Sequence, residues 1–259
     1  MSNAIIGYSG FVGSNLILQS HYDYFYNSKN IDDIQEKNFD LLVCSGAYAA
    51  KWIANREPAQ DWENIQYLIN CLRKVTSKKV ILISTVDVYI SPREVDEDTP
   101  IVLEGLHPYG KHRRELEVFI QDNFDSLIIR LPGLFGLGLK KNIIYDFLHK
   151  NMLNNIHKDS FFQFYNLDHI WQDIQIGIKQ NLNLINFATE PTSVAEVAME
   201  AFGFEFTNQP EQTPGFYDMR TKYNHLFSGN KLGYIYEKNQ VLQELKQFIN
   251  KIYNSSHAL

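Results

Sequence analysis

The 259-residue sequence predicts an α/β fold, a doubly wound parallel sheet followed by a small, mostly helical C-terminal lobe. Short apolar runs alternate with longer stretches of helical periodicity, which is the pattern of a parallel sheet covered on both faces. The first apolar run leads through a glycine-rich turn into a helix, the opening of a strand–helix–strand unit. The apolar share of 44% is enough to fill one large core.

The elements alternate in order along the first region. We expect strands in AIIG, YDYFY, FDLLVCSGA, KKVILISTVDVY and SLIIRLPGLFG. Between them we expect helices in GSNLILQS, IDDIQE, EPAQDWENIQYLINCLRKV and YGKHRRELEVFIQDNF. In the second region we expect helices in KKNIIYDFLHKNML, LDHIWQDIQIGIKQ, VAEVAMEAF and KNQVLQELKQFINKIY, with a buried strand in LINFATEP. Residues 1–140 would form the sheet domain and residues 141–259 the lobe, with 181–191 adding a strand to the sheet.

Composition excludes several classes of function. The formal net charge of −6 comes with no long basic run, so nucleic acid is not an expected partner. The sequence has no apolar run of about 18 residues, the length that a membrane helix needs. Cys44 and Cys71 lack the spacing of a metal site, and the chain shows no signal peptide. We therefore expect a cytoplasmic protein without a metal.

A turn of the form G-x-x-G-x-x-G stands between the first strand and its helix. Such glycines permit a tight turn, close approach of backbone N–H groups to a pyrophosphate, and close packing of helix on strand. The alternative is three chance glycines among 14, but the strand before them and the helix after them favour a Rossmann-like dinucleotide site. Its expected contacts are Gly7, Gly10, Phe11, Val12 and Gly13.

The end of the second strand bears on the type of dinucleotide. It reads Asn27-Ser28-Lys29, and Lys29 with Ser28 would hold a 2′-phosphate, so the sequence favours NADP within an NAD(P) prediction. Asp32 and Asp33 stand near the distance at which an acidic residue holds the ribose hydroxyls of NAD. We expect them past the strand end, where they would cap a helix.

Four stretches together resemble one family. The chain resembles the extended short-chain dehydrogenases, namely the sugar-nucleotide epimerases, dehydratases and 4-keto reductases, through GYSGFVG, STVDVY, YGKHR and RLPGLFG. The resemblance implies an NAD(P)-dependent epimerase or 4-keto reductase acting on a nucleotide-linked sugar. In that family a Ser or Thr four residues before an aromatic bonds the reacting sugar oxygen, and a Tyr-x-x-x-Lys pair moves the proton. Thr85, four before Tyr89, and Tyr109 match these positions.

The same residues converge on one crevice without the family. Ligands of open α/β sheets bind at the carboxyl ends of the strands. Gly7, Ser45, Thr85 and Pro132 fall at or just past such ends. We add Ser45, Gly46, Ala47 and Pro132 to the expected cofactor contacts. The alternative for Thr85 is a β-branched residue that only packs in its strand.

The acidic position after the threonine departs from the resembling dehydratases. They carry an acidic pair there, whereas this chain reads Val86-Asp87, so elimination of water is not implied. Asp87 either serves as an acid or base beside the sugar carbon that reacts, or caps the end of the strand.

The lysine of the Tyr-x-x-x-Lys pair is replaced by Arg113. A free phenol titrates near pH 10 and needs a neighbouring cation to work near neutrality. Arg113 would favour the phenolate and hold ribose hydroxyls but not relay a proton. Lys111, two residues from Tyr109, lies on a different side of the helix. The alternative is a solvated face with an Arg113–Glu117 pair, which we accept for Lys111 and Arg114, and we expect His112 at the surface.

The second region carries weaker signals. In the resembling enzymes the smaller lobe grips the nucleotide diphosphate, and Asn142 and Arg220 are the substrate-binding candidates, although a lone arginine also suits a surface ion pair. An aromatic group would build the core of the lobe or a homodimer contact: Phe161, Phe162, Phe164, Tyr165 and Trp171. The lost lysine and the short lobe motivate a rival function, a catalytically idle dinucleotide-binding protein with a sensing or scaffold role.

Overall fold

The computed structural model describes residues 2–227, 229 and 231–256. The chain divides into two units. The first comprises residues 1–90, 99–131 and 169–185, and the second comprises residues 91–98, 132–168 and 186–259. Within the described residues, no helix is long and apolar enough to cross a membrane.

A six-stranded sheet organises the first unit, in the order β10-β6-β4-β3-β1-β2. Its strands are β1 (Asn3–Ile6), β2 (Tyr24–Tyr26), β3 (Asn38–Cys44), β4 (Thr76–Thr85), β6 (Ser126–Leu131) and β10 (Leu184–Asn186). The pairs β1–β2, β1–β3, β3–β4 and β4–β6 are parallel. The expected doubly wound α/β sheet is thereby confirmed.

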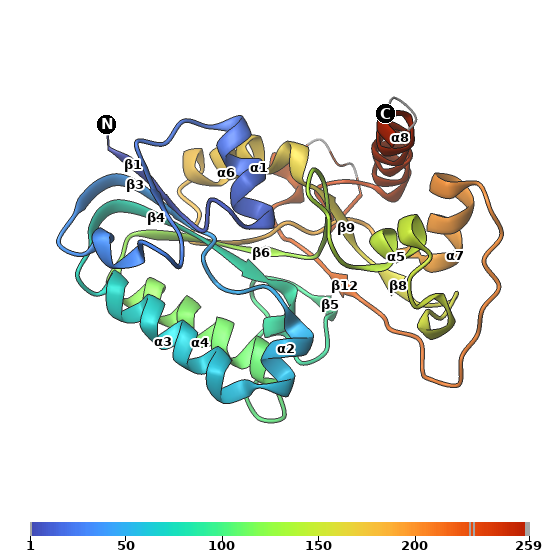
Figure 1. The fold of residues 1–259 in the computed structure, drawn as a ribbon, viewed down its shortest axis with the longest axis horizontal. Coiled ribbons are helices and arrows are strands. Elements are labelled where there is room, and N and C mark those ends of the chain that lie inside the picture. The colour runs from blue at the N-terminus through green and yellow to red at the C-terminus, as the bar shows by residue number, and fades with distance from the viewer. Residues whose placement is uncertain (1, 228, 230, 257–259) are drawn as a thin grey trace. The chain divides into compact units, whose positions relative to one another are not determined.

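Helices cover both faces of this sheet (Figure 1). On one face lie α1 (Phe11–Gln19) and α6 (Ile170–Lys179), and on the other lie α3 (Pro58–Leu72) and α4 (Pro108–Asn123). A short helix that we did not expect, α2 (Lys51–Arg56), packs against α3 and α4. The stretch IDDIQE forms only a 3₁₀ turn, η1 (Ile31–Ile34).

The placement of α6 corrects an expectation. The sequence pattern assigns this helix to the second lobe, but it belongs to the first unit, where it packs beside α1. Its Gly177 lies so close to the sheet that an added Cβ would stand 2.8 Å from the Leu127 side chain. Trp171 goes with it, and its ring packs edge-on against Tyr22 with centroids 6.2 Å apart.

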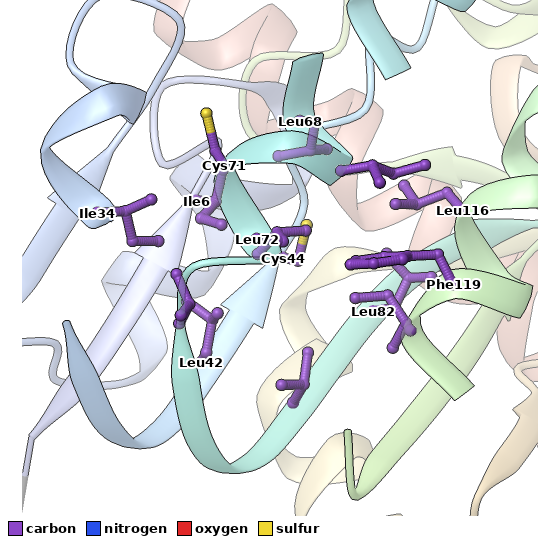
Figure 2. Close-up of a cluster of buried hydrophobic side chains, with 14 of the residues drawn as sticks. Ile6, Ile34, Leu42, Cys44, Leu68, Cys71, Leu72, Leu82, Leu116 and Phe119 are labelled. Atoms are coloured by element: carbon purple, nitrogen blue, oxygen red, sulfur yellow. The ribbon is translucent and has the colours of Figure 1, made fainter. Parts of the chain in front are cut away.

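One apolar cluster of the first unit lies between the sheet and the pair α3 and α4 (Figure 2). Alternate residues of the strands, such as Leu42 and Leu82, face Leu72 of α3 and Leu116 of α4. Cys44 lies in the same core and has no disulfide partner. Burial raises the pKa of its thiol to about 11, so the thiol stays protonated and packs as a small apolar group.

The second unit combines short strand pairs with helices. The pairs are β5 (Arg93–Val95) with β12 (Asp218–Met219), β7 (Gly133–Phe135) with β9 (Phe164–Asn166), and β8 (Phe161–Phe162) with β11 (Thr192–Ser193). The helices are α5 (Ile143–His149), α7 (Val194–Val197), which continues as a π-helix over Ala198–Phe202, and α8 (Lys238–Ser256). Phe164 and Tyr165 are buried in its core.

Candidate active site

The glycine turn lies where the strand order reverses. From β1 the chain passes to β2 on one side and then to β3 on the other, so the switch point lies between β1 and β3. Gly7 has φ +83°, and a Cβ there would stand 2.4 Å from the Ser45 carbonyl oxygen. The Ser45 hydroxyl donates to the Ile6 carbonyl at 2.9 Å, which holds the two strand ends together. A side chain at position 7 is therefore excluded.

The N-terminus of α1 opens beside this turn. A Cβ on Gly13 would stand 2.0 Å from the Gly7 carbonyl oxygen, so glycine is required for the helix to approach the turn. Gly10 is the N-cap and supplies no side-chain cap. The first N–H groups of a helix, here those of Phe11, Val12 and Gly13, have no partner within the helix and favour an anion. This cradle fits a dinucleotide pyrophosphate.

Asn27, Ser28 and Lys29 form the turn that follows β2. The Lys29 N–H donates to Asn27 Oδ1 at 2.9 Å, and Asn27 Nδ2 donates to Ser9 Oγ of the glycine turn at 3.5 Å. Ser28 and Lys29 are exposed. This arrangement sets the two residues beside the glycine turn, at the edge of the sheet.

The expected capping role of Asp32 and Asp33 is wrong. The N-cap of η1 is Asn30, and both aspartates lie inside the first turn. Asp32 instead accepts a hydrogen bond from the Tyr67 hydroxyl of α3 at 2.6 Å. That bond directs the Asp32 carboxylate toward the helix layer.

Thr85, Asp87 and Tyr109 come together at the carboxyl end of β4. Thr85 Oγ1 accepts from the Asp87 N–H at 3.2 Å, so Thr85 rather than Asp87 caps the short helix η2 (Val86–Val88) that follows the strand. A Cβ on Gly110 would stand 2.0 Å from the Asp87 carbonyl oxygen. Because position 110 is glycine, the start of α4 can bring Tyr109 against this strand end.

The N-terminus of α4 is satisfied from within the protein. Pro108 opens the helix and has no N–H. The Tyr109 N–H donates to Asn55 Oδ1 of α2 at 3.0 Å, and the Gly110 N–H donates to His107 Nδ1 at 3.1 Å. This helix start therefore positions Tyr109, whereas the start of α1 is available to an anion.

The cap on α4 predicts a pH dependence of stability. Burial and the nearby Lys51 ammonium lower the pKa of His107, and Asp87 opposes them. As pH falls, His107 of the unfolded state takes up a proton before His107 of the folded state. The contribution of this cap to the free energy of unfolding is therefore complete above the unfolded-state pKa of about 6.5, and it is lost as pH falls through the folded-state pKa. Below pH about 6.5 we expect wild-type protein to lose up to about 1 kcal/mol more unfolding free energy than His107→Asn. Parallel curves in urea denaturation against pH would contradict this.

Tyr109 is buried among opposing charges. Burial raises the pKa of its phenol, Arg113 lowers it, Asp87 raises it, and a hydrogen bond from Thr85 and the charge of Lys51 lower it. Burial prevails, so the pKa is raised and the phenol is protonated at neutral pH. Such a phenol is ready to donate a proton, and it needs nearby cations to accept one.

Arg113 takes part in a buried ion pair that the sequence pattern concealed. Its Nη1 donates to Asp61 of α3, its Nη2 donates to the Tyr48 carbonyl, and its guanidinium lies over the Tyr109 ring, 4.1 Å from the centroid. The side chain is 4% exposed. The alternative Arg113–Glu117 pair on a solvated face is therefore wrong for both residues. Each terminal nitrogen already makes one hydrogen bond inside the protein, and the expected contact of Arg113 with ribose hydroxyls stays a prediction.

The surface position expected for His112 is also wrong. Its Nδ1 lies 2.6 Å from Asp61 Oδ2, and its side chain is 12% exposed. Lys111 is exposed, as expected.

Sequence reasoning missed Lys51 and Asn55, both on α2. Lys51 Nζ donates to Asp87 Oδ1 at 2.6 Å, and Asn55 holds the Tyr109 N–H. The segment AYAAKWIANR contains no motif, and a single lysine in it resembles any surface lysine. The signal that could have found the pair is their spacing of four residues, which puts both on one side of a helix.

Gly46 and Ala47 lie in the loop after β3 of the first unit, and the other predicted residues lie in the second unit. Pro132 directly follows β6. Asn142 has φ +101° and caps α5, accepting from the Ile144 N–H at 3.0 Å and donating to the Leu134 carbonyl at 2.8 Å. Arg220 pairs with the buried Asp218 at 2.8 Å and with the exposed Glu94 at 2.7 Å, and the second is a surface ion pair as in the alternative interpretation. Roles of Asn142 and Arg220 toward a diphosphate stay predictions. In the part of the chain that the structure describes, no group of His, Cys, Asp or Glu could hold a metal ion.

Comparison with solved structures identifies the fold. The chain is similar to a UDP-galactose 4-epimerase (TM-score 0.73, 14% identity, 98% of this chain and 99% of that chain). It is similar to a dTDP-4-dehydrorhamnose reductase of Clostridium acetobutylicum (TM-score 0.72, 15% identity, 98% and 100%). It is also similar to MoeE5 in complex with UDP-glucose and NAD (TM-score 0.72, 14% identity, 98% and 99%). Neither a protein-family model nor a curated protein matches the chain. The likeness confirms the Rossmann-like fold that the resemblance implied.

Proposed function

We propose that this protein is an NAD(P)-dependent enzyme of the extended short-chain dehydrogenase type that acts as an epimerase or 4-keto reductase on a nucleotide-linked sugar. One observation carries the proposal: Thr85 and Tyr109 meet at the carboxyl end of β4 in the sheet whose switch point carries the glycine turn. The similar structures support the substrate class, since they include a UDP-galactose epimerase and a complex with UDP-glucose and NAD.

The cofactor would lie across the carboxyl ends of β1, β2 and β3. The N–H groups of Phe11, Val12 and Gly13 would hold the pyrophosphate, and Ser28 and Lys29 would meet the adenosine ribose. Gly46 and Ala47, in the loop after β3, would line its middle. When bound, the nicotinamide supplies the acceptor or donor of a hydride.

Thr85 and Tyr109 would handle the proton of the reacting sugar oxygen. In oxidation the Tyr109 phenolate takes the hydroxyl proton while the C–H bond releases its hydride, leaving a carbonyl. In reduction the protonated phenol returns that proton to the carbonyl oxygen as the hydride arrives at carbon. Thr85 would orient the same oxygen by a hydrogen bond. The raised pKa of Tyr109 suits the reductive direction in the absence of further positive charge.

Cofactor binding is the first test. We expect NADH or NADPH to raise the melting temperature of the protein and to quench or shift its tryptophan fluorescence on titration. Gly10→Glu places a carboxylate at the anion-binding helix start and should abolish both effects. Val118→Glu, on an exposed position of α4, should leave both effects intact. No response to any nicotinamide dinucleotide would refute the proposed function.

Lys29 predicts the choice between NADP and NAD. Lys29→Ala should weaken NADPH binding about tenfold, the loss of one charge-assisted hydrogen bond to a phosphate, and leave NADH binding within about twofold. Competitive fluorescence titration of wild type and variant measures both constants. Equal losses for the two cofactors, or none, would remove the preference for NADP.

The second candidate function is a catalytically idle dinucleotide-binding protein. The observation that favours it is the state of Arg113, which is held by Asp61 and the Tyr48 carbonyl and cannot replace a titratable lysine. Cofactor binding without turnover of any nucleotide sugar would support this candidate.

A further inference from the structure

We propose that Lys51 of α2, held beside Thr85 by Asp87, supplies to the Tyr109 phenol the titratable cation that α4 lacks. This inference rests on the proposed function and deepens it. Lys51 would add, from a different helix, a cation that can exchange its proton, and Arg113 would supply a permanent charge over the Tyr109 ring.

The geometry of α2 places Lys51 at the carboxyl end of β4, beside Asp87 and Thr85. Lys51 and Asn55 are four residues apart and so share one side of the helix. Asn55 Oδ1 accepts from the Tyr109 N–H at 3.0 Å, which fixes that side of α2 against the start of α4. Lys51 Nζ lies 2.6 Å from Asp87 Oδ1. One side of one short helix therefore holds the backbone of Tyr109 and places an ammonium on the carboxylate beside Thr85.

Asp87 links this ammonium to the proton-handling pair. Its N–H donates to Thr85 Oγ1 at 3.2 Å, and its Oδ2 lies 3.5 Å from the same oxygen. Its side chain is 16% exposed, and that of Lys51 is 38% exposed. The lysine can therefore reach solvent to exchange a proton, while its partner stays fixed at the end of β4.

The other charges around Tyr109 are less suited to the task. Arg113 of α4 faces the ring, is paired with Asp61 of α3, and cannot release a proton. His107 of α4 uses its Nδ1 to accept from the Gly110 N–H, which requires the neutral ring on that side. Lys51 of α2 combines an ammonium, paired with Asp87, with a proton that it can exchange.

Lys51 and Asp87 act on Tyr109 with opposite signs. The ammonium lowers the pKa of the phenol, and the carboxylate raises it. Removing each charge in turn should therefore move the titration of the phenol in opposite directions. Loosened packing around Tyr109 would move both variants the same way, so the pair of variants separates an electrostatic role from a structural one.

The test is the titration of the phenol itself. Trifluorotyrosine, incorporated at position 109 by amber suppression in the full chain, brings the titration into a range where the protein stays folded and gives a fluorine NMR signal. We expect Lys51→Met to raise the midpoint by about one pH unit and Asp87→Asn to lower it by about as much. Lys51→Arg should restore a midpoint near that of the unchanged chain. Lys111→Met, two residues past Tyr109 but exposed, should leave it unchanged.

An unchanged midpoint in Lys51→Met would overturn the inference. If that variant does not fold, an Asp87→Asn midpoint that rises or stays in place overturns it equally. The titration needs neither cofactor nor sugar, so its outcome is separate from that of the proposed function. Cofactor binding with no shift in Lys51→Met refutes only the role of Lys51, whereas the expected shifts without cofactor binding refute only the proposed function.

Discussion

Replacing Tyr109 by phenylalanine is expected to lower the turnover of a nucleotide sugar at least about a hundredfold, the usual effect of removing a general acid or base. The change removes one oxygen from a residue that is 8% exposed and keeps the ring. The Arg113 guanidinium can still stack on that ring, so the local fold should persist. Steady-state rates at saturating sugar, with cofactor affinity measured in parallel, give the two quantities to compare.

Cofactor affinity should stay within about twofold of wild type in Tyr109→Phe if the phenol serves proton transfer. Tyr253→Phe is the matched control, because this tyrosine on α8 is 44% exposed. It should leave both rate and affinity unchanged. An unimpaired rate in Tyr109→Phe would remove the phenol from the mechanism, whatever the cofactor does.

Replacing Glu117 by alanine is expected to lower the free energy of unfolding by about 3–5 kcal/mol, because it leaves a buried arginine without its partner. Glu117 is 0% exposed and Arg130 is 2% exposed. Arg130 Nη2 donates to Glu117 Oε2 at 2.7 Å, and its Nε donates to Oε1 at 3.0 Å. The Ser84 hydroxyl donates to Oε1 at 2.6 Å.

These hydrogen bonds connect α4 to β4 and β6, so their loss should also affect the candidate active site. Urea denaturation followed by circular dichroism measures the change. Lys111→Ala on the exposed side of α4 should cost less than about 0.5 kcal/mol and is the control. A loss below about 1 kcal/mol in Glu117→Ala would show that the pair is not an essential part of the core. Glu117→Leu combined with Arg130→Met should recover much of the loss, because apolar residues of similar volume can replace a buried ion pair.

Periodicity and turn chemistry predicted most of the sheet and its helices. The glycine turn was recognisable because its backbone demands are local: Gly7 needs positive φ, and Gly13 must let the helix touch the turn. The strands with long apolar runs were equally clear. The position of Thr85 at a strand end followed from the general location of ligands in such sheets, whereas Tyr109 was assigned through the family resemblance.

The charges on α4 could not be assigned from the sequence. Arg113 and Glu117 lie on the side of α4 that faces the protein, where each meets a partner from another element, Asp61 and Arg130. The sequence does not show whether a charged residue is buried or exposed to water. The four-residue spacing of Arg113 and Glu117 suggested a pair that does not form. Lys51 was missed for a related reason, since its importance depends on a contact between α2 and a residue 36 positions away in the chain.

The most direct test of the proposed function is turnover itself. Purified protein with NAD(H) or NADP(H) is incubated with a panel of UDP- and dTDP-linked hexoses and their 4-keto forms, and the products are identified by NMR and mass spectrometry. We predict an epimer of the same mass, or an alcohol that has gained two hydrogen atoms, formed by wild-type protein and lost in Tyr109→Phe. Cofactor binding without change in any sugar would contradict the proposed function and leave a dinucleotide-binding protein that performs no chemistry.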